Sequence, residues 1–252
     1  MRKLGVILSA YGIEEYVKPC LNSWIKFDIP IACSSFQFQN FEKQSNAACV
    51  NELKKLLPEE CIFYDENKSF KEHEARNISL DYLKNNTDID TVLILDVDEF
   101  YTEKEIENLL KFINSEDFSW IAWAKINFKN YVFDGKSWTD DFCPPRIFKI
   151  KYQDYALDKF YWDNDILYID KNSASVDYKQ LSSITVPKNK IHVKHMTWLD
   201  NERSKNKIKY QEKHFGSCSY QWNDSKKCVE INKDFYKKSG QIPPTIYNDI
   251  YA

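Results

Sequence analysis

The amino-acid sequence predicts an α/β fold with a mostly parallel central sheet flanked by helices. Over about the first 115 residues, short apolar runs alternate with segments of helical spacing, an order typical of parallel strands connected by helices. Asp96, Asp98 and Glu99 follow the fourth apolar run directly. After residue 115, aromatic-rich strands and loops replace the alternation, which indicates a second, mixed half.

Four apolar runs are the expected strands of the first half. They are KLGVILSA at 3–10, DIPIACSS at 28–35, CIFYD at 61–65 and TVLIL at 91–95. The first run is apolar almost throughout, which favours a strand that helices cover on both faces.

Three segments have helical spacing, at 13–26, 69–85 and 102–113. Ser69 with Glu72, and Thr102 with Glu105, have the spacing of a capping box, in which two side chains satisfy the first N–H groups of a helix. Pro19 falls inside the first segment, where we expect it at a first helical turn or at a kink.

The second half is expected to contain strands at 119–133 and 146–152 and one within 184–200. A basic helix follows at 201–216, and Gly216 is expected where this helix ends. Because no repeat or low-complexity linker interrupts the chain, we expect one compact domain over residues 1–252.

Composition and charge argue against several classes of protein. The 35 Lys and Arg residues and 38 Asp and Glu residues give a net charge of -3, which does not favour nucleic acid or an anionic membrane as partner. No apolar run approaches the roughly 18 residues of a membrane span, so no transmembrane segment is expected. The start of the chain is interpreted as a strand, not a secretion signal. Seven cysteines without a CxxC pair indicate reduced thiols and a cytoplasmic protein.

The carboxylates after the fourth run indicate a cation site. Ligands of an open parallel sheet bind at the carboxyl ends of its strands. Asp96 and Asp98 lie two residues apart, so their side chains are expected to project to the same side. Two hard oxygen donors suit Mg²⁺ or Mn²⁺, which keep positions open for phosphate oxygens. The alternative is that one Asp caps the next helix, but Thr102 already occupies the capping position.

Three segments in order resemble the family 2 type glycosyltransferases of the GT-A fold. LSAYGIEEYVKPCLNSWI resembles their first strand and helix, HEARNISLDYL their ARN helix, and LILDVDEF their DxD element in its DxDE form. Order and spacing match over about residues 1–115, and more loosely to about 215. The resemblance implies a single GT-A domain with a nucleotide-sugar-binding half at 1–115, an acceptor half at 116–200 and a C-terminal basic helix and tail at 201–252.

This resemblance implies a metal-dependent glycosyltransferase that moves a sugar from a nucleotide-diphosphate donor, with a UDP-sugar favoured, to a saccharide or another hydroxyl acceptor. Mn²⁺ or Mg²⁺ is the implied cofactor. Asp98 corresponds to the ligand of the metal on the diphosphate, and Asp96 to the residue that reaches the ribose or a water of the metal. Ala10 and Tyr11 are implied to line the base and ribose, and Arg76 to lie against the nucleotide.

The second strand departs from the family pattern. Many members end it with an Asp that reads the base, whereas this chain has ACSSFQ at 32–37. Ser34 or Ser35 is expected to substitute, which leaves the identity of the base open.

The segment HVKHMTWLDNERSKNKIKY resembles a region in which such enzymes place a His near the metal and diphosphate. His195 is the expected metal ligand, with His192 as the alternative, because neutral imidazole binds Mn²⁺ alongside carboxylates. Arg203 and Lys207 are expected to offset phosphate charge as the nucleotide leaves, although a solvated basic face is the alternative interpretation.

An inverting enzyme also needs a carboxylate near the acceptor hydroxyl, and Asp141 is the predicted base. Its competitors are Asp140, Asp158, Asp163 and Asp165. Whether transfer inverts or retains the anomeric configuration does not follow from the sequence. Four tryptophans of the acceptor half either stack on sugar rings or fill the core: Trp120, Trp123, Trp138 and Trp162. The basic stretch at 203–238 permits a nucleic-acid acceptor, but the acidic whole chain does not favour one.

Two other functions remain open at this stage. Phosphatases of the haloacid dehalogenase type also carry DxD after an apolar strand, with the first Asp as nucleophile. Their motif normally lies near the amino terminus and continues with Thr or Val, whereas here it continues with Glu99 and Phe100. The other alternative is a catalytically inactive domain that binds a sugar or a nucleotide.

Overall fold

The structure, a computed structural model, describes residues 2–38, 45–132, 136–139, 143–161, 165–198, 201–226, 228–240 and 245–248. The chain divides into two compact units. The first unit comprises Met1–Ile126 and Cys143–Ile191, and the second comprises Asn127–Phe142 and His192–Ala252. The assignment of residues 116–200 to an acceptor half stays a prediction.

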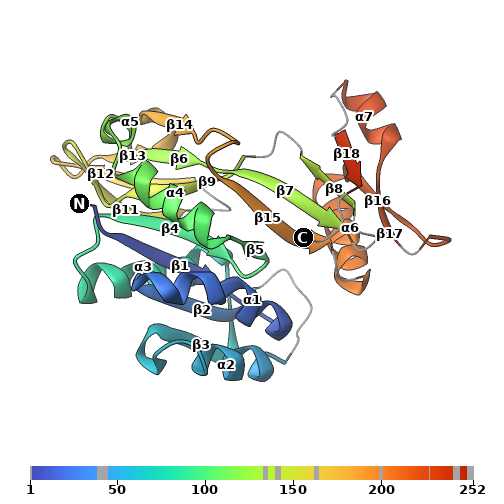
Figure 1. The fold of residues 1–252 in the computed structure, drawn as a ribbon, viewed down its shortest axis with the longest axis horizontal. Coiled ribbons are helices and arrows are strands. Elements are labelled where there is room, and N and C mark those ends of the chain that lie inside the picture. The colour runs from blue at the N-terminus through green and yellow to red at the C-terminus, as the bar shows by residue number, and fades with distance from the viewer. Residues whose placement is uncertain are drawn as a thin grey trace. The chain divides into compact units, whose positions relative to one another are not determined.

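The first unit is built around a seven-stranded sheet in the order β14-β6-β9-β4-β1-β2-β3 (Figure 1). The bounds of its strands are β1 Leu4–Ser9, β2 Ile31–Phe38, β3 Ile62–Phe70, β4 Thr91–Asp96, β6 Trp123–Lys125, β9 Pro145–Lys149 and β14 Ser183–Thr185. Strands β3, β2, β1 and β4 pair in parallel, while β9 runs antiparallel to both β4 and β6. The predicted α/β fold with a mostly parallel central sheet is therefore confirmed.

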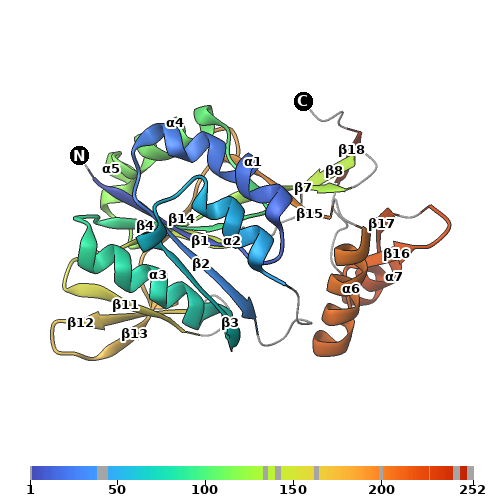
Figure 2. The ribbon, with the colours of Figure 1, turned by 90° about the horizontal axis from the view of Figure 1, so that it is seen from below.

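Helices cover both faces of this sheet. The helices of the unit are α1 Glu14–Trp24, α2 Ala47–Lys54, α3 Glu72–Asn86, α4 Glu103–Ile113 and the short α5 Glu116–Ser119. Figure 2 shows α1 and α4 along one face, and α3 along the other. Strands β1 and β4 lie between these layers, and every residue from Thr91 to Leu95 is buried. This double cover explains why both strands are apolar runs in the sequence.

The start of α4 follows its predicted capping box. The Thr102 hydroxyl accepts from the Glu105 backbone N–H at 3.2 Å, and the Glu105 carboxylate accepts from the Thr102 N–H at 2.7 Å. The box predicted at Ser69 and Glu72 is wrong, because β3 extends to Phe70 and pairs Ser69 with Gln37 of β2.

Helix α3 instead begins at Glu72, and Glu74 accepts from the backbone N–H of Lys71 at 2.8 Å. Helix α1 continues through Pro19 from Glu14 to Trp24.

A smaller antiparallel sheet completes the first unit, on the same side as α3 (Figure 2). Its strands are β10 Lys151–Tyr152, β11 Tyr155–Tyr161, β12 Asp165–Asp170 and β13 Ser175–Asp177. Trp123 belongs to the core beneath it, since it is 5% exposed and its indole N–H donates to the Tyr178 carbonyl oxygen at 2.8 Å. Trp120, in contrast, is 70% exposed.

One sheet of the second unit has its strands in the order β18-β8-β7-β15. They are β7 Asn127–Val132, β8 Lys136–Thr139, β15 His192–Trp198 and β18 Thr245–Asn248. Helix α6 Asn201–Phe215, the hairpin of β16 Tyr220–Asn223 and β17 Cys228–Ile231, and helix α7 Lys233–Ser239 follow. Gly216 has a φ of 72°, the left-handed conformation expected at the end of α6. No helix in the described part of the chain is long and apolar enough to cross a membrane.

Candidate functional site

The candidate site lies where the central parallel strands of the first unit end. Register pairs Ser9 at the end of β1 with Asp96 at the end of β4 on one side and with Ser34 of β2 on the other. The loop that begins at Ala10 therefore leaves the sheet directly beside Asp96. A ligand of a parallel sheet is expected at this edge.

Strand β4 ends at Asp96, and the chain turns at Val97 and Asp98 before β5 Glu99–Phe100. The Val97 N–H donates to the Ser9 carbonyl oxygen at 3.0 Å, which fixes the start of the turn against β1. The alternation of side chains along a strand therefore does not extend to Asp98. The expectation that both Asp side chains project to one side assumed a strand where the chain forms a turn. Asp96 and Asp98 are half-buried, while Glu99 is completely buried.

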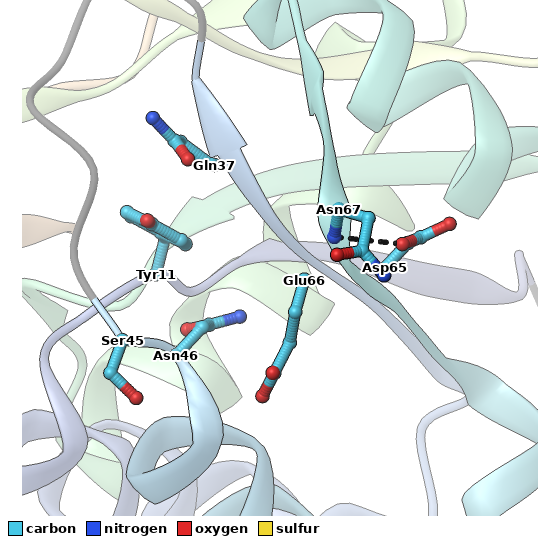
Figure 3. A pocket seen from close by; sticks show the side chains of 7 residues that line it. All are labelled: Tyr11, Gln37, Ser45, Asn46, Asp65, Glu66 and Asn67. Carbon is cyan, nitrogen blue, oxygen red and sulfur yellow. Dashed lines mark hydrogen bonds between the residues drawn. The ribbon is translucent and has the colours of Figure 1, made fainter.

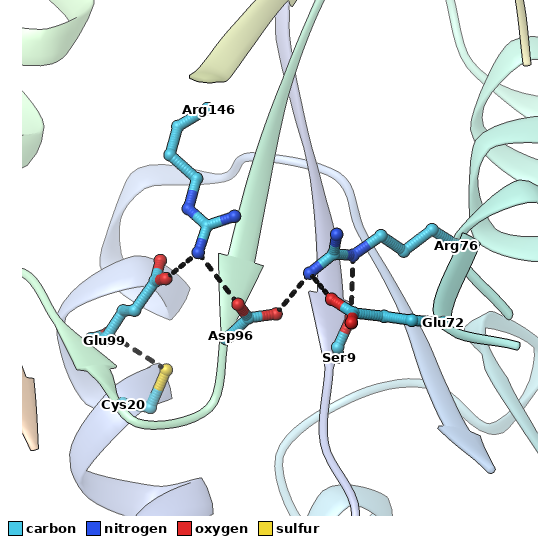
Figure 4. A network of polar contacts seen from close by, with 7 residues as sticks. All are labelled: Ser9, Cys20, Glu72, Arg76, Asp96, Glu99 and Arg146. Atoms are coloured by element: carbon cyan, nitrogen blue, oxygen red, sulfur yellow. Dashed lines mark hydrogen bonds and ion pairs between the residues drawn. The ribbon is translucent and has the colours of Figure 1, made fainter. Parts of the chain in front are cut away.

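Asp96 lies between two arginines (Figure 4). Its Oδ1 accepts from Arg76 of α3 at 2.9 Å, and its Oδ2 accepts from Arg146 of β9 at 2.9 Å. The two arginine side chains are 3% and 6% exposed. Burial by itself raises the pKa of Asp96, but the attraction of Arg76 and Arg146 outweighs this effect, so the pKa lies below its ordinary value. Asp96 is therefore held ionised.

The same two arginines each bind a second carboxylate. Arg76 forms an ion pair with Glu72, one turn earlier on α3, and Arg146 forms one with Glu99. Complete burial raises the pKa of Glu99 well above its ordinary value, and the attraction of Arg146 offsets this only in part. Figure 4 shows the resulting chain of contacts from Glu72 through Arg76, Asp96 and Arg146 to Glu99.

Arg146 is not among the site residues predicted from the sequence. The only local signal is a charged residue that heads an apolar strand directly after two prolines. Its partner Asp96 lies 50 residues earlier in the chain, so the pairing depends on β9 joining the sheet beside β4. No pattern of neighbouring residues identifies it.

The donor set around the turn fits a hard divalent cation. Three of the four acidic groups here, Asp96, Glu72 and Glu99, form ion pairs with Arg76 or Arg146, and Asp98 adds a half-buried carboxylate at the turn. Within the described residues, no group of three or more His, Cys, Asp or Glu side chains is arranged so that it could hold a metal ion by itself. Mg²⁺ needs no such group, because it commonly takes one or two protein carboxylates together with waters and phosphate oxygens.

A hollow of about 320 Å³ opens beyond the ends of β1 and β2 and beside β3 (Figure 3). It is lined by Tyr11, Gln37, Ser45, Asn46, Asp65, Glu66 and Asn67. Its volume lies at the lower end of the range for small-molecule sites, about 300–1,000 Å³. The structure thus places Tyr11 in this lining, whereas Ala10 is 1% exposed and lies in the core.

Ser34 and Ser35, the expected substitutes for a base-reading Asp, do not line the hollow. Each is 1% exposed. The Ser34 hydroxyl donates to the Ala75 carbonyl oxygen at 2.5 Å, and the Ser35 hydroxyl donates to the Ala10 carbonyl oxygen at 2.6 Å. Both serines therefore hold β2 to its neighbours, and the expectation that one of them faces the base is wrong.

Asn46 and Asp65 shape two sides of the hollow. The Asn46 amide donates to the Ser35 carbonyl oxygen at 2.6 Å and accepts from the Gly12 N–H at 3.2 Å, so it ties the loop after β1 to β2. Asp65 accepts from the Asn67 N–H at 2.9 Å, and this bond, with help from Lys68, lowers the Asp65 pKa. This acidic side was not predicted from the sequence, because the third strand was expected to end at residue 65, whereas β3 continues to Phe70.

The predicted residues for the diphosphate lie in the second unit. His195 and His192 lie on β15, and the His195 ring packs on Phe128 with ring centroids 5.1 Å apart. Arg203 and Lys207 lie on α6. Their roles at a diphosphate stay predictions.

None of the proposed bases is tested. Asp141 lies outside the described residues, as do its competitors Asp140 and Asp163. Asp158 is half-buried on β11, and Asp165 begins β12. Trp162 also lies outside the described residues, and Trp138 is placed only as part of β8.

No protein-family model matches the chain, and no curated protein sequence matches it. Among solved structures, it is similar to TarS of S. aureus. A crystal structure of residues 1–349 of TarS in complex with UDP-GlcNAc has a TM-score of 0.48 and 16% identity, over 83% of this chain and 64% of that one. Another crystal structure of the same TarS fragment has a TM-score of 0.45 and 16% identity, over 83% of this chain and 65% of that one. A further TarS structure has a TM-score of 0.46 and 16% identity, over 89% of this chain and 41% of that one.

The chain thus spans less than two thirds of the length of these TarS structures. At such TM-scores and identities the likeness decides neither activity nor substrate.

Proposed function

We propose that the chain is a metal-dependent glycosyltransferase that uses a nucleotide-diphosphate sugar, most favourably a UDP-sugar, and a hydroxyl-bearing acceptor such as a saccharide. One observation carries the proposal: the Asp96–Val97–Asp98 element ends the central parallel strand β4, and its first carboxylate pairs with Arg76 of the ARN helix. The two motifs that resemble the family 2 type thus meet in one contact.

The hollow is the proposed site of the base and ribose. It is lined by Tyr11, which lies two residues after Ser9, the register partner of Asp96. A nucleotide seated there would direct its diphosphate toward the turn at Asp98. Polar groups on several sides of the hollow and the ring of Tyr11 supply the contacts that a base and a ribose need.

Asp98 is the proposed holder of the cation, together with phosphate oxygens of the donor. A bound Mn²⁺ or Mg²⁺ would offset the negative charge that grows on the diphosphate as the sugar leaves. Asp96, which precedes the turn, is held by Arg76 and Arg146. We further propose Asp141 as the base for the acceptor hydroxyl, and His195, Arg203 and Lys207 as groups that meet the diphosphate.

A phosphatase of the haloacid dehalogenase type is the less favoured alternative. Its chemistry requires the first Asp of DxD as a nucleophile. Here both carboxylate oxygens of Asp96 accept hydrogen bonds from buried arginines at 2.9 Å, which withdraws the electron density that an attack on phosphorus requires. A domain that binds a sugar nucleotide without catalysis is the other alternative, and only a transfer assay separates it from an enzyme.

The test is a thermal-shift panel of UDP, GDP, CDP and dTDP and their sugars, including UDP-GlcNAc, each with Mn²⁺ and with EDTA. A ligand that binds only the folded state, at a concentration of about 100 times its Kd, stabilises the fold by about 2.7 kcal/mol. We expect a shift with one nucleotide that requires Mn²⁺ and disappears in Asp98→Ala. No shift with any nucleotide would overturn the proposal. A rise in melting temperature with a nucleotide, but no release of that nucleotide from its sugar with any acceptor of a panel, would favour the inactive domain. Hydrolysis of an aryl phosphate would favour the phosphatase.

A further inference from the structure

A single nitrogen of Arg146 contacts both ends of the turn that carries Asp98. Its Nη2 donates to Asp96 Oδ2 at 2.9 Å and also to Glu99 Oε1 (Figure 4). Asp96 ends β4 and Glu99 begins β5, so Val97 and Asp98 are the residues enclosed between the two contacts. Arg146 therefore closes a four-residue loop from outside it.

The contacts of Arg146 are shielded from water. Its side chain is 6% exposed and that of Glu99 is 0% exposed. The second oxygen of Glu99, Oε2, has no hydrogen-bond partner among the described residues. A buried carboxylate that is incompletely bonded is expensive to keep, and apolar residues of similar volume often replace a buried ion pair without loss of stability. The pair is thus better explained by the geometry it imposes than by the stability it adds.

The surrounding contacts leave Asp96 engaged on both oxygens, by Arg76 on one side and by Arg146 on the other. Asp98 is half-buried at the turn between these anchors. The direction of its carboxylate depends on the backbone of the turn, and that backbone is fixed at one end by Asp96 and at the other by Glu99. Arg146 joins those two ends.

We infer that Arg146 is a positioning residue that closes the Asp96–Glu99 turn and thereby aims the Asp98 carboxylate at the cation, with Glu99 as its buried counterion. The inference rests on the proposed function, because that function makes Asp98 the cation holder. It assigns Asp96 to the support beneath the cation, in place of the ligand role expected from the sequence. Groups that orient a metal ligand from behind typically change metal affinity or activity by about 10- to 100-fold when removed.

The test measures Mn²⁺ binding by calorimetry, with and without UDP, together with the melting temperature of each variant. Arg146→Met alone leaves Glu99 buried and unpaired, which risks unfolding the protein. The main variant is therefore the double substitution Arg146→Met with Glu99→Leu, which removes both members of the buried pair and retains the packing volume. Arg146→Lys is the second variant, because it keeps the charge but has a shorter reach. Lys149→Met, three residues further along β9, is the matched control.

We expect the double variant to fold, with a melting temperature below that of wild type because Asp96 loses one of its two arginine contacts, and to bind Mn²⁺ about 10- to 100-fold more weakly. Arg146→Lys is expected to show a smaller loss of Mn²⁺ affinity, and Lys149→Met is expected to show no loss of Mn²⁺ affinity. If the double variant is folded and binds Mn²⁺ like wild type, the inference is overturned while the proposed function stands. If the double variant does not fold, unchanged Mn²⁺ affinity in Arg146→Lys overturns the inference instead. If the wild type itself binds neither Mn²⁺ nor any nucleotide, the proposed function fails, and the inference fails with it.

Discussion

Arg76 on α3 and Asp96 at the end of β4 are joined by a hydrogen-bonded ion pair of 2.9 Å. The same guanidinium pairs with Glu72, and its Nε lies 3.5 Å from the Ser9 hydroxyl of β1. One side chain, only 3% exposed, therefore ties a helix to the two central strands at the edge where a ligand is expected. Because Arg76 is almost completely buried, its contacts stabilise the fold in addition to any role they have in binding a ligand.

The first prediction concerns the stability that Arg76 supplies. Arg76→Met removes the cation between Asp96 and Glu72 and leaves both half-buried carboxylates without this partner. Breaking a buried ion pair from one side typically costs about 3–5 kcal/mol, so urea unfolding should show a loss of that order. Lys3→Met is the control, because the Lys3–Asp88 pair is exposed and its loss should change little. Equal effects in the two variants would contradict the buried role of Arg76.

The second prediction separates Asp96 from Asp98. Asp96→Asn weakens two buried arginine contacts and should destabilise the protein by about 3 kcal/mol. Asp98→Asn should lower stability less, since Asp98 lies in the turn and is only half-buried. It should, however, abolish the Mn²⁺-dependent rise in melting temperature with a nucleotide. Measurements of both quantities on both variants check this, and a reversed pattern would place the cation on Asp96.

These contrasts show what local sequence could and could not specify. The fully covered strands β1 and β4 were predictable, because a strand buried on both faces must be apolar along its whole length. The capping box of Thr102 and Glu105 was also predictable, since it involves only residues three apart. The false box at Ser69 arose because pairing with Gln37 extended β3 past the expected end, and strand pairing is not a local property.

The parts of the site that escaped prediction depend on contacts between distant segments. Arg146 reaches Asp96 across 50 residues, and Ser34 reaches Ala75 across 41. Whether a polar side chain faces a ligand or a neighbouring element is decided by what packs against it. The sequence therefore identified the Asp96–Asp98 element, but not the second arginine that supports it or the side chains that line the hollow.

The third prediction follows from the buried position of Ser34. Ser34→Ala removes the bond to the Ala75 carbonyl oxygen and the contact with the Ser79 hydroxyl, and should cost about 1–3 kcal/mol of stability. It should not change the preference among UDP, GDP, CDP and dTDP. Tyr11→Ala is the paired variant, because Tyr11 lines the hollow. Loss of stacking on a base typically costs about 1–3 kcal/mol, so nucleotide affinity should fall in that variant. A changed preference in Ser34→Ala would restore the serine to the base site.

The fourth prediction concerns Lys149, a 6% exposed residue on β9. Its ammonium donates to the Ser119 carbonyl oxygen at 2.9 Å and lies over the rings of Phe118 and Tyr152, 4.9 and 5.1 Å from their centroids. Burial, with a smaller contribution from Arg2, lowers the Lys149 pKa from 10.5 to about 8. Between these two values the unfolded chain holds a proton that the folded chain has released. The contribution of Lys149 to folding stability therefore rises with pH across that window.

Lys149→Met removes this dependence. At pH 7 the wild type keeps a buried ammonium that the variant lacks, so the stability of the variant relative to wild type should be greatest there. That advantage should shrink as the pH rises from about 8 toward 10.5, by on the order of 3 kcal/mol. Urea unfolding of both proteins at four pH values between 7 and 10 measures the difference directly. Lys84→Met on α3 corrects for the general titration of surface groups. A difference that stays constant with pH would show that the folded protein does not lower the pKa of Lys149.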